Sequence, residues 1–277
     1  MKKQSFWSRT LIYLLLLGGA LLSTIPFLFM LSTSFKEHSY VFELPPRFIP
    51  ENPTLSNYIQ AWTWNNFELY FTNSFVVSLV TTLIVLIVAS MLAFAFARFR
   101  FWGKNILYYL ILSSLMVPSM MLIIPQFILA KNLRLLNSLP GLVFVYVAMN
   151  VAVSTFLLRG FFESLPRELE DATRMDGGGF FTIFFRIVLP LSKPSLATVT
   201  VFTFLFGWDE FVWALTAINQ QSRLTLPVAI HSFHGAHQTQ WGLVFAASMF
   251  AIAPVLIAFV LLQRHFIQGL TSGAIKG

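Results

Sequence analysis

The sequence predicts an all-α integral membrane protein with six transmembrane helices and one short cytoplasmic helix between the fourth and the fifth. Of its 277 residues, 57% are hydrophobic and only 10% are charged, and the mean hydropathy is +0.74. These values lie far outside the range of soluble domains. Uncharged runs recur along the chain, and about 20 apolar residues in a helix cross the ~30 Å hydrocarbon core of a bilayer. We therefore expect one transmembrane domain over residues 1–277.

Six apolar runs are the expected transmembrane spans. Their approximate ranges are 11–33, 70–97, 105–130, 136–158, 195–215 and 241–262. The first span follows Lys2, Lys3 and Arg9. A cleaved signal peptide would have a shorter apolar region that ends at an Ala-x-Ala-like site. The sequence shows no such site, so we expect the first span to be retained.

The second and third spans differ in their small residues and prolines. Ala89, Ala93 and Ala97 repeat every four residues in the second span, which places small side chains on one helix face and predicts close packing there. Pro118 and Pro125 lie inside the third span, where proline kinks a helix and frees backbone carbonyl groups. The prolines fit a path for a substrate or a simple bend in a packed bundle equally well.

The distribution of Lys and Arg predicts the orientation, because basic loops stay on the cytoplasmic side. With six spans, both termini lie on one side. The basic residues on that side are Lys2, Lys3, Arg9, Arg98, Arg100, Lys104, Arg159, Arg167, Arg174, Arg186, Lys193, Arg264 and Lys276, and those on the other side are Lys36, Arg47, Lys131, Arg134 and Arg223. The larger group places both termini and the connection between the fourth and fifth spans in the cytoplasm.

That connection, residues 163–194, is dense in acidic residues. Five of the eleven acidic residues of the chain lie between Glu163 and Asp176, although an exposed loop needs only a few charges to remain in water. We interpret the density as a docking surface for a soluble partner. The alternative is an ordinary interfacial helix that contacts only water and lipid headgroups.

The same connection carries the signals of a short helix from Leu165 to Asp176. Ser164 is a suitable N-cap residue, and Pro166 suits the first turn. Three acidic residues favour the positive end of the helix dipole, namely Glu168, Glu170 and Asp171. Gly177–Gly179 supply a stop where positive φ is allowed.

A recognisable pattern lies within this connection. It comprises Asp171, Ala172, Thr173, Asp176, Gly177, Ile187, Pro190 and Pro194. The pattern resembles the EAA loop of the permease subunits of binding-protein-dependent ABC importers, which reads Glu-Ala-Ala, two residues, Asp-Gly, and later Ile-x-x-Pro with a second Pro. Asp171 stands where Glu is usual, Thr173 stands where Ala is usual, and Gly178 replaces a further common Ala.

The resemblance extends over most of the chain and is greatest for sugar importers of the maltose, multiple-sugar and glycerol-phosphate types. The similar segments outside the loop are Asn57-Tyr58, Gly207–Leu215, Leu224–Pro227, Trp241-Gly242 and Gly269–Gly277. It implies a carbohydrate importer of the bacterial or archaeal cytoplasmic membrane that works by alternating access. The implied partners are a second homologous permease, two ABC ATPase subunits and an extracytoplasmic solute-binding protein.

The chain lacks the Gly-x-x-x-x-Gly-Lys-Ser/Thr motif of a phosphate-binding loop. We therefore expect a non-catalytic subunit that binds no cofactor, with ATP and Mg²⁺ bound by the partner ATPases. Movement of the ATPases would reach this chain through residues 165–178, which would act as a coupling helix. The residues expected to seat it on an ATPase are Glu168, Asp171, Ala172, Met175, Asp176 and Gly177.

Asp209 and Glu210 are costly residues in the fifth span. A carboxylate at the centre of a bilayer is penalised by about 3 kcal/mol or more unless it faces water or a partner. The candidates for a substrate pathway are Trp208, Asp209, Glu210 and Trp213. The alternative places both acids near the outer interface, bonded to loops or to the partner permease. In the similar sugar permeases, Asn is usual at the position of Asp209.

Other functional classes have weak support. His231, His234 and His237 would not share one helix face, and Gly235 interrupts the segment, so we expect no metal site. The basic residues do not gather on one soluble face, which argues against a nucleic-acid partner. A stand-alone secondary transporter or channel is the remaining alternative, but it calls for internal repeats and ion-coupling acids in several spans. The sequence has no cysteine, which excludes disulfides and thiolate chemistry.

Overall fold

The computed structural model describes residues 6–37, 47–63, 66–233 and 239–274. The described residues form helices joined by turns and short connections, without a strand. The chain divides into two compact units. Unit 1 comprises Met1–Phe67 and Ala229–Ala253, and unit 2 comprises Glu68–Val228 and Pro254–Gly277.

Unit 1 contains α1, Phe6–Ser34, and α2, Ser56–Thr63, together with the first part of α13, Trp241–Ala274. Buried Asn57 of α2 donates hydrogen bonds from Nδ2 to the carbonyl oxygens of Ser34 and Lys36, at 3.0 and 2.5 Å. A Cβ atom on Gly242 would lie 2.6 Å from the same Nδ2. The end of α1, the start of α2 and the start of α13 therefore meet around one asparagine.

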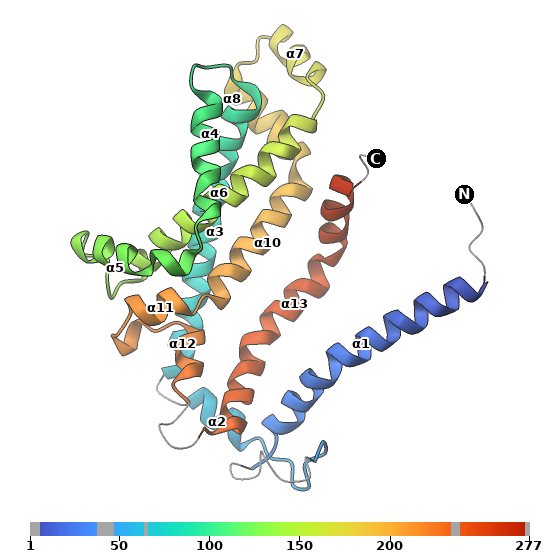
Figure 1. Ribbon diagram of the computed structural model, residues 1–277, viewed down its shortest axis with the longest axis vertical. Helices are drawn as coiled ribbons and strands as arrows, with labels where there is room; N and C mark the ends of the chain where they lie inside the picture. Colours follow the sequence, from blue (N-terminus) through green and yellow to red (C-terminus); the bar gives the residue numbers. More distant parts are fainter. Residues whose placement is uncertain (1–5, 38–46, 64–65, 234–238, 275–277) are drawn as a thin grey trace. The chain divides into compact units, whose positions relative to one another are not determined.

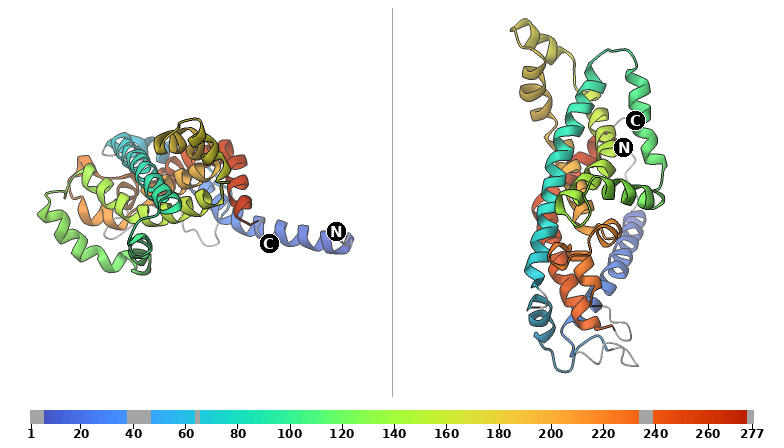
Figure 2. Two further views of the ribbon diagram at one scale, coloured as in Figure 1. Left: turned by 90° about the horizontal axis from the view of Figure 1, so that it is seen from above. Right: turned by 90° about the vertical axis from the view of Figure 1, so that its left-hand side faces the viewer.

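Unit 2 holds the remaining helices. Their bounds are α3 Phe67–Arg98, α4 Lys104–Ser113, α5 Ile123–Asn132, α6 Leu139–Ser164, α7 Glu168–Met175, α8 Phe180–Thr182, α9 Leu189–Leu191, α10 Lys193–Asp209, α11 Val212–Ala217 and α12 Leu226–His231, the last of which begins in unit 2 and ends in unit 1. A π-helix spans Ile183–Val188, and short 3-10 helices span Ser114–Met116, Ser119–Leu122 and Gln221–Arg223. Within unit 2, α7 lies at one end and α11 lies towards the other (Figures 1 and 2).

Two apolar clusters hold unit 2 together. The first joins α3, α6, the π-helix and α10 through Val85, Ala89, Ala93, Phe94, Ala97, Leu158, Phe162, Ile183, Phe184, Val188 and Val199. The second joins α3, α5, α6 and α11, and includes Val77, Ala130, Leu142, Tyr146, Trp213 and Ala214. The first cluster confirms the predicted close packing on the small-residue face of the second span.

Three described helices are long and apolar enough to cross a membrane, namely Arg9–Ser34, Phe67–Arg98 and Leu139–Ser164. Two bent pairs raise that number to five if each pair is one span. Lys104–Met116 meets Ser119–Asn132 at 94°, and Phe180–Leu191 meets Lys193–Asp209 at 76°. Trp241–Ile257 within α13 is a shorter apolar helix.

The third predicted span, 105–130, is bent, as its prolines predict: the chain turns at Pro118, which has an extended ψ of 128°. Pro125 lies in the first turn of α5, where proline is tolerated. The fifth predicted span, 195–215, is not one continuous helix, since α10 ends at Asp209 and extended Glu210 separates it from α11.

The short helix predicted between the fourth and fifth spans, α7, begins later than expected. It starts at Glu168, because Leu165 precedes Pro166 and a residue before proline is pushed into an extended conformation. Ser164 does not cap it: this serine is the last residue of α6, and its hydroxyl donates to the Phe161 carbonyl. The predicted stop is confirmed, since α7 ends at Met175 and Gly177 has a φ of +80°.

Candidate functional site

The side of α7 opposite to Glu170 is acidic and exposed to solvent. We define the α7 surface as the six exposed residues Glu168, Asp171, Ala172, Met175, Asp176 and Gly177. Met175 is the most exposed of its large apolar side chains, at 88%. Three carboxylates therefore surround a protruding methionine, and such a surface fits a partner with basic groups around an apolar pocket.

Glu170 points the opposite way and is the buried acid of α7. Its Oε1 lies 2.5 Å from Nε of Arg98, the last residue of α3, and the two side chains are only 6% and 3% exposed. Arg98 also donates from Nη2 to the Leu165 carbonyl oxygen at 3.0 Å. The guanidinium fork thus holds both α7 and the connection that precedes it. Breaking a buried pair by removing one partner typically costs about 3–5 kcal/mol.

The chain after α7 is also tightly folded. The Gly178 amide donates to the Thr173 carbonyl oxygen at 2.8 Å, and a Cβ atom on Gly178 would lie 2.6 Å from Thr173 Cγ2. The π-helix that follows contributes Phe184, whose ring centroid lies 5.1 Å from that of Phe94 in α3. Helix α7 is therefore connected to the first apolar cluster on both of its sides.

The break between α10 and α11 is organised by Glu210. Its Oε1 accepts from the Trp213 amide at 2.7 Å, and its Oε2 accepts from the Ala214 amide at 3.0 Å. The Tyr146 hydroxyl of α6 donates to the same Oε2 at 2.6 Å. These bonds satisfy amide groups that the first turn of α11 would otherwise leave unpaired. Glu210 is therefore a helix cap tied to α6.

Trp208 and Trp213 are packing residues in this structure. Each is only 1% exposed. Trp208 lies against Phe71 and Phe204, with ring centroids 5.2 and 5.9 Å apart. Trp213 belongs to the second apolar cluster. Neither ring lies on the surface of unit 2.

Asp209 is the exposed member of the predicted set, and it lines a cavity of about 820 Å³ between α6 and α10. The cavity is largely apolar, with a few polar groups near its wall. Its lining residues include Asn150, Ser154, Phe202, Thr203, Phe206 and Asp209. A mostly apolar wall with a small number of polar groups is typical of sites that bind small molecules.

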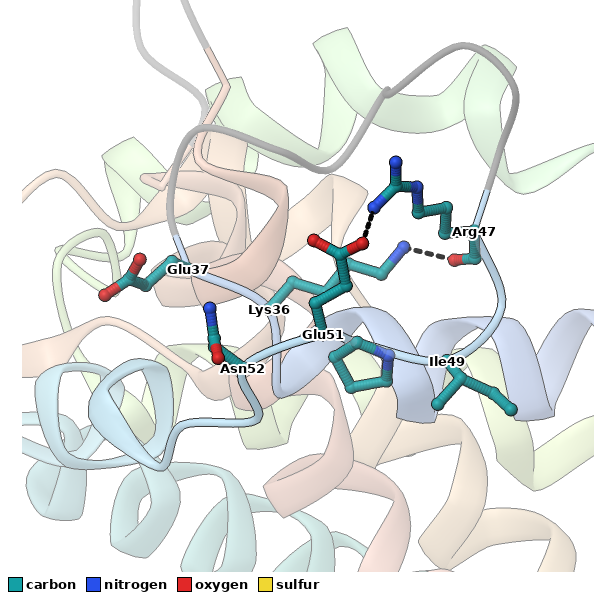
Figure 3. Close-up of a pocket in the computed structure, with 7 residues that line it drawn as sticks. Lys36, Glu37, Arg47, Ile49, Glu51 and Asn52 are labelled. Atoms are coloured by element: carbon teal, nitrogen blue, oxygen red, sulfur yellow. Dashed lines mark hydrogen bonds and ion pairs between the residues drawn. The ribbon is translucent and has the colours of Figure 1, made fainter.

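A second cavity, of about 380 Å³, lies in unit 1 in the connection after α1 (Figure 3). Three of its charged residues contact one another. Lys36 donates to the Arg47 carbonyl oxygen, and Arg47 pairs with Glu51. Because these contacts engage three of the charged side chains, the cavity offers a weaker candidate site than the one beside Asp209.

Among the described residues, no group of three His, Cys, Asp or Glu side chains is placed to hold a metal ion. His234 and His237 lie outside the described residues. The sequence singled out the residues of the α7 surface and Asp209, and the structure exposes them. The sequence did not indicate the ion pair of Arg98 with Glu170, since Arg98 stood out only as one of the basic residues that set the orientation. No local sequence pattern marks this pair, because its two residues lie far apart in the chain.

Comparisons with known proteins agree on one group of proteins. Residues 85–272 match the family described as binding-protein-dependent transport system inner membrane component. The chain is 34% identical to the sulfoquinovosyl glycerol transport system permease protein SmoH of Agrobacterium fabrum (strain C58 / ATCC 33970), over 91% of this chain and 88% of that protein. It is 32% identical to the trehalose transport system permease protein SugB of Mycobacterium tuberculosis (strain CDC 1551 / Oshkosh), over 100% and 99%.

The fold is also similar to that of a solved structure. One chain of a bacterial ABC transporter involved in the import of the acidic polysaccharide alginate superimposes with a TM-score of 0.83, over 96% of this chain and 100% of that chain. The two sequences are 23% identical. At that identity the match shows a common fold.

Proposed function

Since this chain belongs to the inner-membrane components of binding-protein-dependent transport systems, among the sugar ABC transporter permeases, we propose that it forms half of a carbohydrate pathway. A second homologous permease supplies the other half, and an extracytoplasmic solute-binding protein delivers an oligosaccharide or related sugar. Two separate ABC ATPase subunits bind ATP and Mg²⁺ and drive import. This chain contributes no catalytic residue and no cofactor.

The observation that carries the proposal is the two-sided helix α7. One side is the α7 surface, where exposed carboxylates surround Met175. The other side is fixed to α3 by the buried Arg98–Glu170 pair. A helix that is anchored within the permease and open to a partner is suited to carry movement from an ATPase to the membrane helices. The six α7 surface residues are the proposed contacts.

The proposed topology has six spans with both termini in the cytoplasm. The three long apolar helices supply spans one, two and four, the two bent pairs supply spans three and five, and α13 supplies the sixth. In this topology, the connections on the same side of the membrane as α7 carry most of the Lys and Arg residues. Basic connections stay on the cytoplasmic side, which supports a cytoplasmic location for α7. This places α7 on the side where ATP is available.

Asp209 is the proposed pathway residue that contacts sugar. It lines the cavity between α6 and α10, and a carboxylate is a good acceptor for sugar hydroxyl groups. The other three predicted residues support the site without contacting sugar. Glu210 caps α11, and the two tryptophans pack the helices that hold the site.

Reconstitution tests the proposal directly. The chain, expressed with its partner permease, ATPases and binding protein, should copurify with the ATPases in detergent. In proteoliposomes the complex should take up sugar only with ATP and binding protein present. Sugar transport by the lone chain in liposomes without ATP would overturn the proposal in favour of a stand-alone secondary transporter or channel.

A further inference from the structure

Helix α7 is linked to the rest of unit 2 by a side-chain ion pair as well as by backbone connections that are not helical. On the side of α6, helical hydrogen bonding ends at Ser164, and Leu165 is extended, with φ −73° and ψ 136°. On the other side, Gly177 takes a φ of +80° before the chain continues to α8. Because neither connection is helical, α7 is not a rigid extension of α6 or of α8.

The Arg98–Glu170 pair supplies the direct link. Both side chains are almost completely buried, at 3% and 6% exposure, and the charged atoms are 2.5 Å apart. Arg98 is the last residue of α3, a helix of 32 residues. Ala97, the residue before it, belongs to the apolar cluster that joins α3 to α6 and α10. A displacement of α7 therefore pulls on a helix that is packed along its length.

We infer that Arg98 is the positioning residue through which α7 moves α3, so that α3 receives the movement of the ATPases. The inference rests on the proposed function and names the residue through which the movement of the ATPases passes within this chain. Separating the pair would leave two buried charges unpaired, so the two helix ends move together instead of sliding apart. Arginine is required because its fork reaches both Glu170 and the Leu165 carbonyl oxygen, whereas lysine presents a single point charge.

Arg174 does not replace this link. Its Nη2 lies 3.9 Å from Glu170 Oε2, but its side chain is half exposed, and it belongs to α7 itself. A contact within one helix cannot transmit movement to another. Contacts of α7 with the π-helix carry movement along the chain towards α10, and the arginine adds a direct route to α3, which is distant in sequence.

The absence of cysteine from the sequence permits a test by site-directed cross-linking. The double variant Arg98→Cys/Glu170→Cys removes the pair, and a bifunctional maleimide can then bridge the two thiols. The full complex is assembled with cysteine-free partner subunits in proteoliposomes. Before bridging, we expect sugar transported per ATP hydrolysed to fall about tenfold, a typical size for coupling between sites. After bridging, verified by mass, we expect the ratio to recover.

A matched control is Arg159→Cys/Glu163→Cys. The ion pair is 2.8 Å long and lies within α6. Arg159 also lies over the Tyr108 ring of α4, 3.8 Å from its centroid, so this variant removes a contact between helices that does not involve α7. We expect this variant to keep the parent ratio with and without the bridge. A role in stability alone would reduce the amount of assembled complex and leave the ratio unchanged in what remains.

A second variant keeps the inference testable if the complex with the double cysteine variant does not assemble. Arg98→Met/Glu170→Met fills the site with apolar side chains, a replacement that proteins often tolerate without loss of stability. We expect assembly together with a low ratio. The inference is overturned if either double variant has the parent ratio, or if bridging leaves the ratio low. Loss of ATP-dependent uptake in the parent complex would instead count against the proposed function.

Discussion

Tyr146 donates a 2.6 Å hydrogen bond from α6 to Glu210, the residue at which the chain breaks between α10 and α11. The same carboxylate accepts two amides from the first turn of α11. One side chain thus satisfies the start of a helix and fixes it to a neighbouring helix. An acid that is expensive in a membrane is retained here because it replaces lost backbone hydrogen bonds.

Replacement of Glu210 should therefore destabilise the protein. Glu210→Ala leaves the Trp213 and Ala214 amides without their acceptor, and we expect a loss of about 1–3 kcal/mol in the free energy of unfolding. Glu210→Gln retains an acceptor and should lose less. Thermal unfolding in detergent provides the measurement. An unchanged Tm for Glu210→Ala would contradict the capping role.

Replacement of Asp209 should impair sugar uptake without destabilising the protein. Its side chain is exposed at the cavity between α6 and α10, so Asp209→Ala should leave Tm nearly unchanged. We expect the KM for sugar uptake by the reconstituted complex to rise about tenfold, equivalent to a charged hydrogen bond worth about 1.5 kcal/mol. Asp209→Asn should retain much of the affinity, since an amide also bonds to hydroxyl groups. Full uptake by Asp209→Ala would remove this residue from the pathway.

The contrast between these neighbouring acids shows what sequence could predict. Both carboxylates stand out in an apolar span, so their importance was visible. Their separate roles depend on where the helix breaks, and α10 ends between them. A break of this kind is set by tertiary contacts such as the one from Tyr146, which lies far away in the sequence.

The two ends of α7 differ in the same way in how far the sequence could predict them. Its end was predictable because Gly177 meets a local requirement for positive φ. Its beginning was not, since Ser164 suits both the last turn of one helix and the cap of the next. The extended conformation of Leu165 before Pro166 decided between them. The ion pair of Arg98 with Glu170 joins residues that only the fold brings together.

Gly242 should be intolerant of a side chain. A Cβ atom there would lie 2.6 Å from Asn57 Nδ2, which holds the carbonyl oxygens of Ser34 and Lys36. We expect Gly242→Ala to lower the free energy of unfolding by about 1–3 kcal/mol, as overpacked sites do. The control is Gly160→Ala in α6, where no atom lies within 4 Å of the added carbon. Equal Tm values for the two variants would contradict the predicted crowding.

The α7 surface should be required for binding of the ATPases. Asp171→Lys reverses a charge on an exposed side chain whose contact with Arg174, at 3.5 Å, contributes little to stability. We expect normal amounts of the permease in the membrane but about tenfold less copurified ATPase, because a like charge now faces the basic groups of the partner. The control is Glu163→Lys, which reverses an exposed charge on α6, outside the α7 surface, and should retain the ATPase. Quantitative pull-down from detergent extracts measures both. If Asp171→Lys retains the ATPase and Glu163→Lys loses it, the contact lies on α6 and the α7 surface is not the docking site.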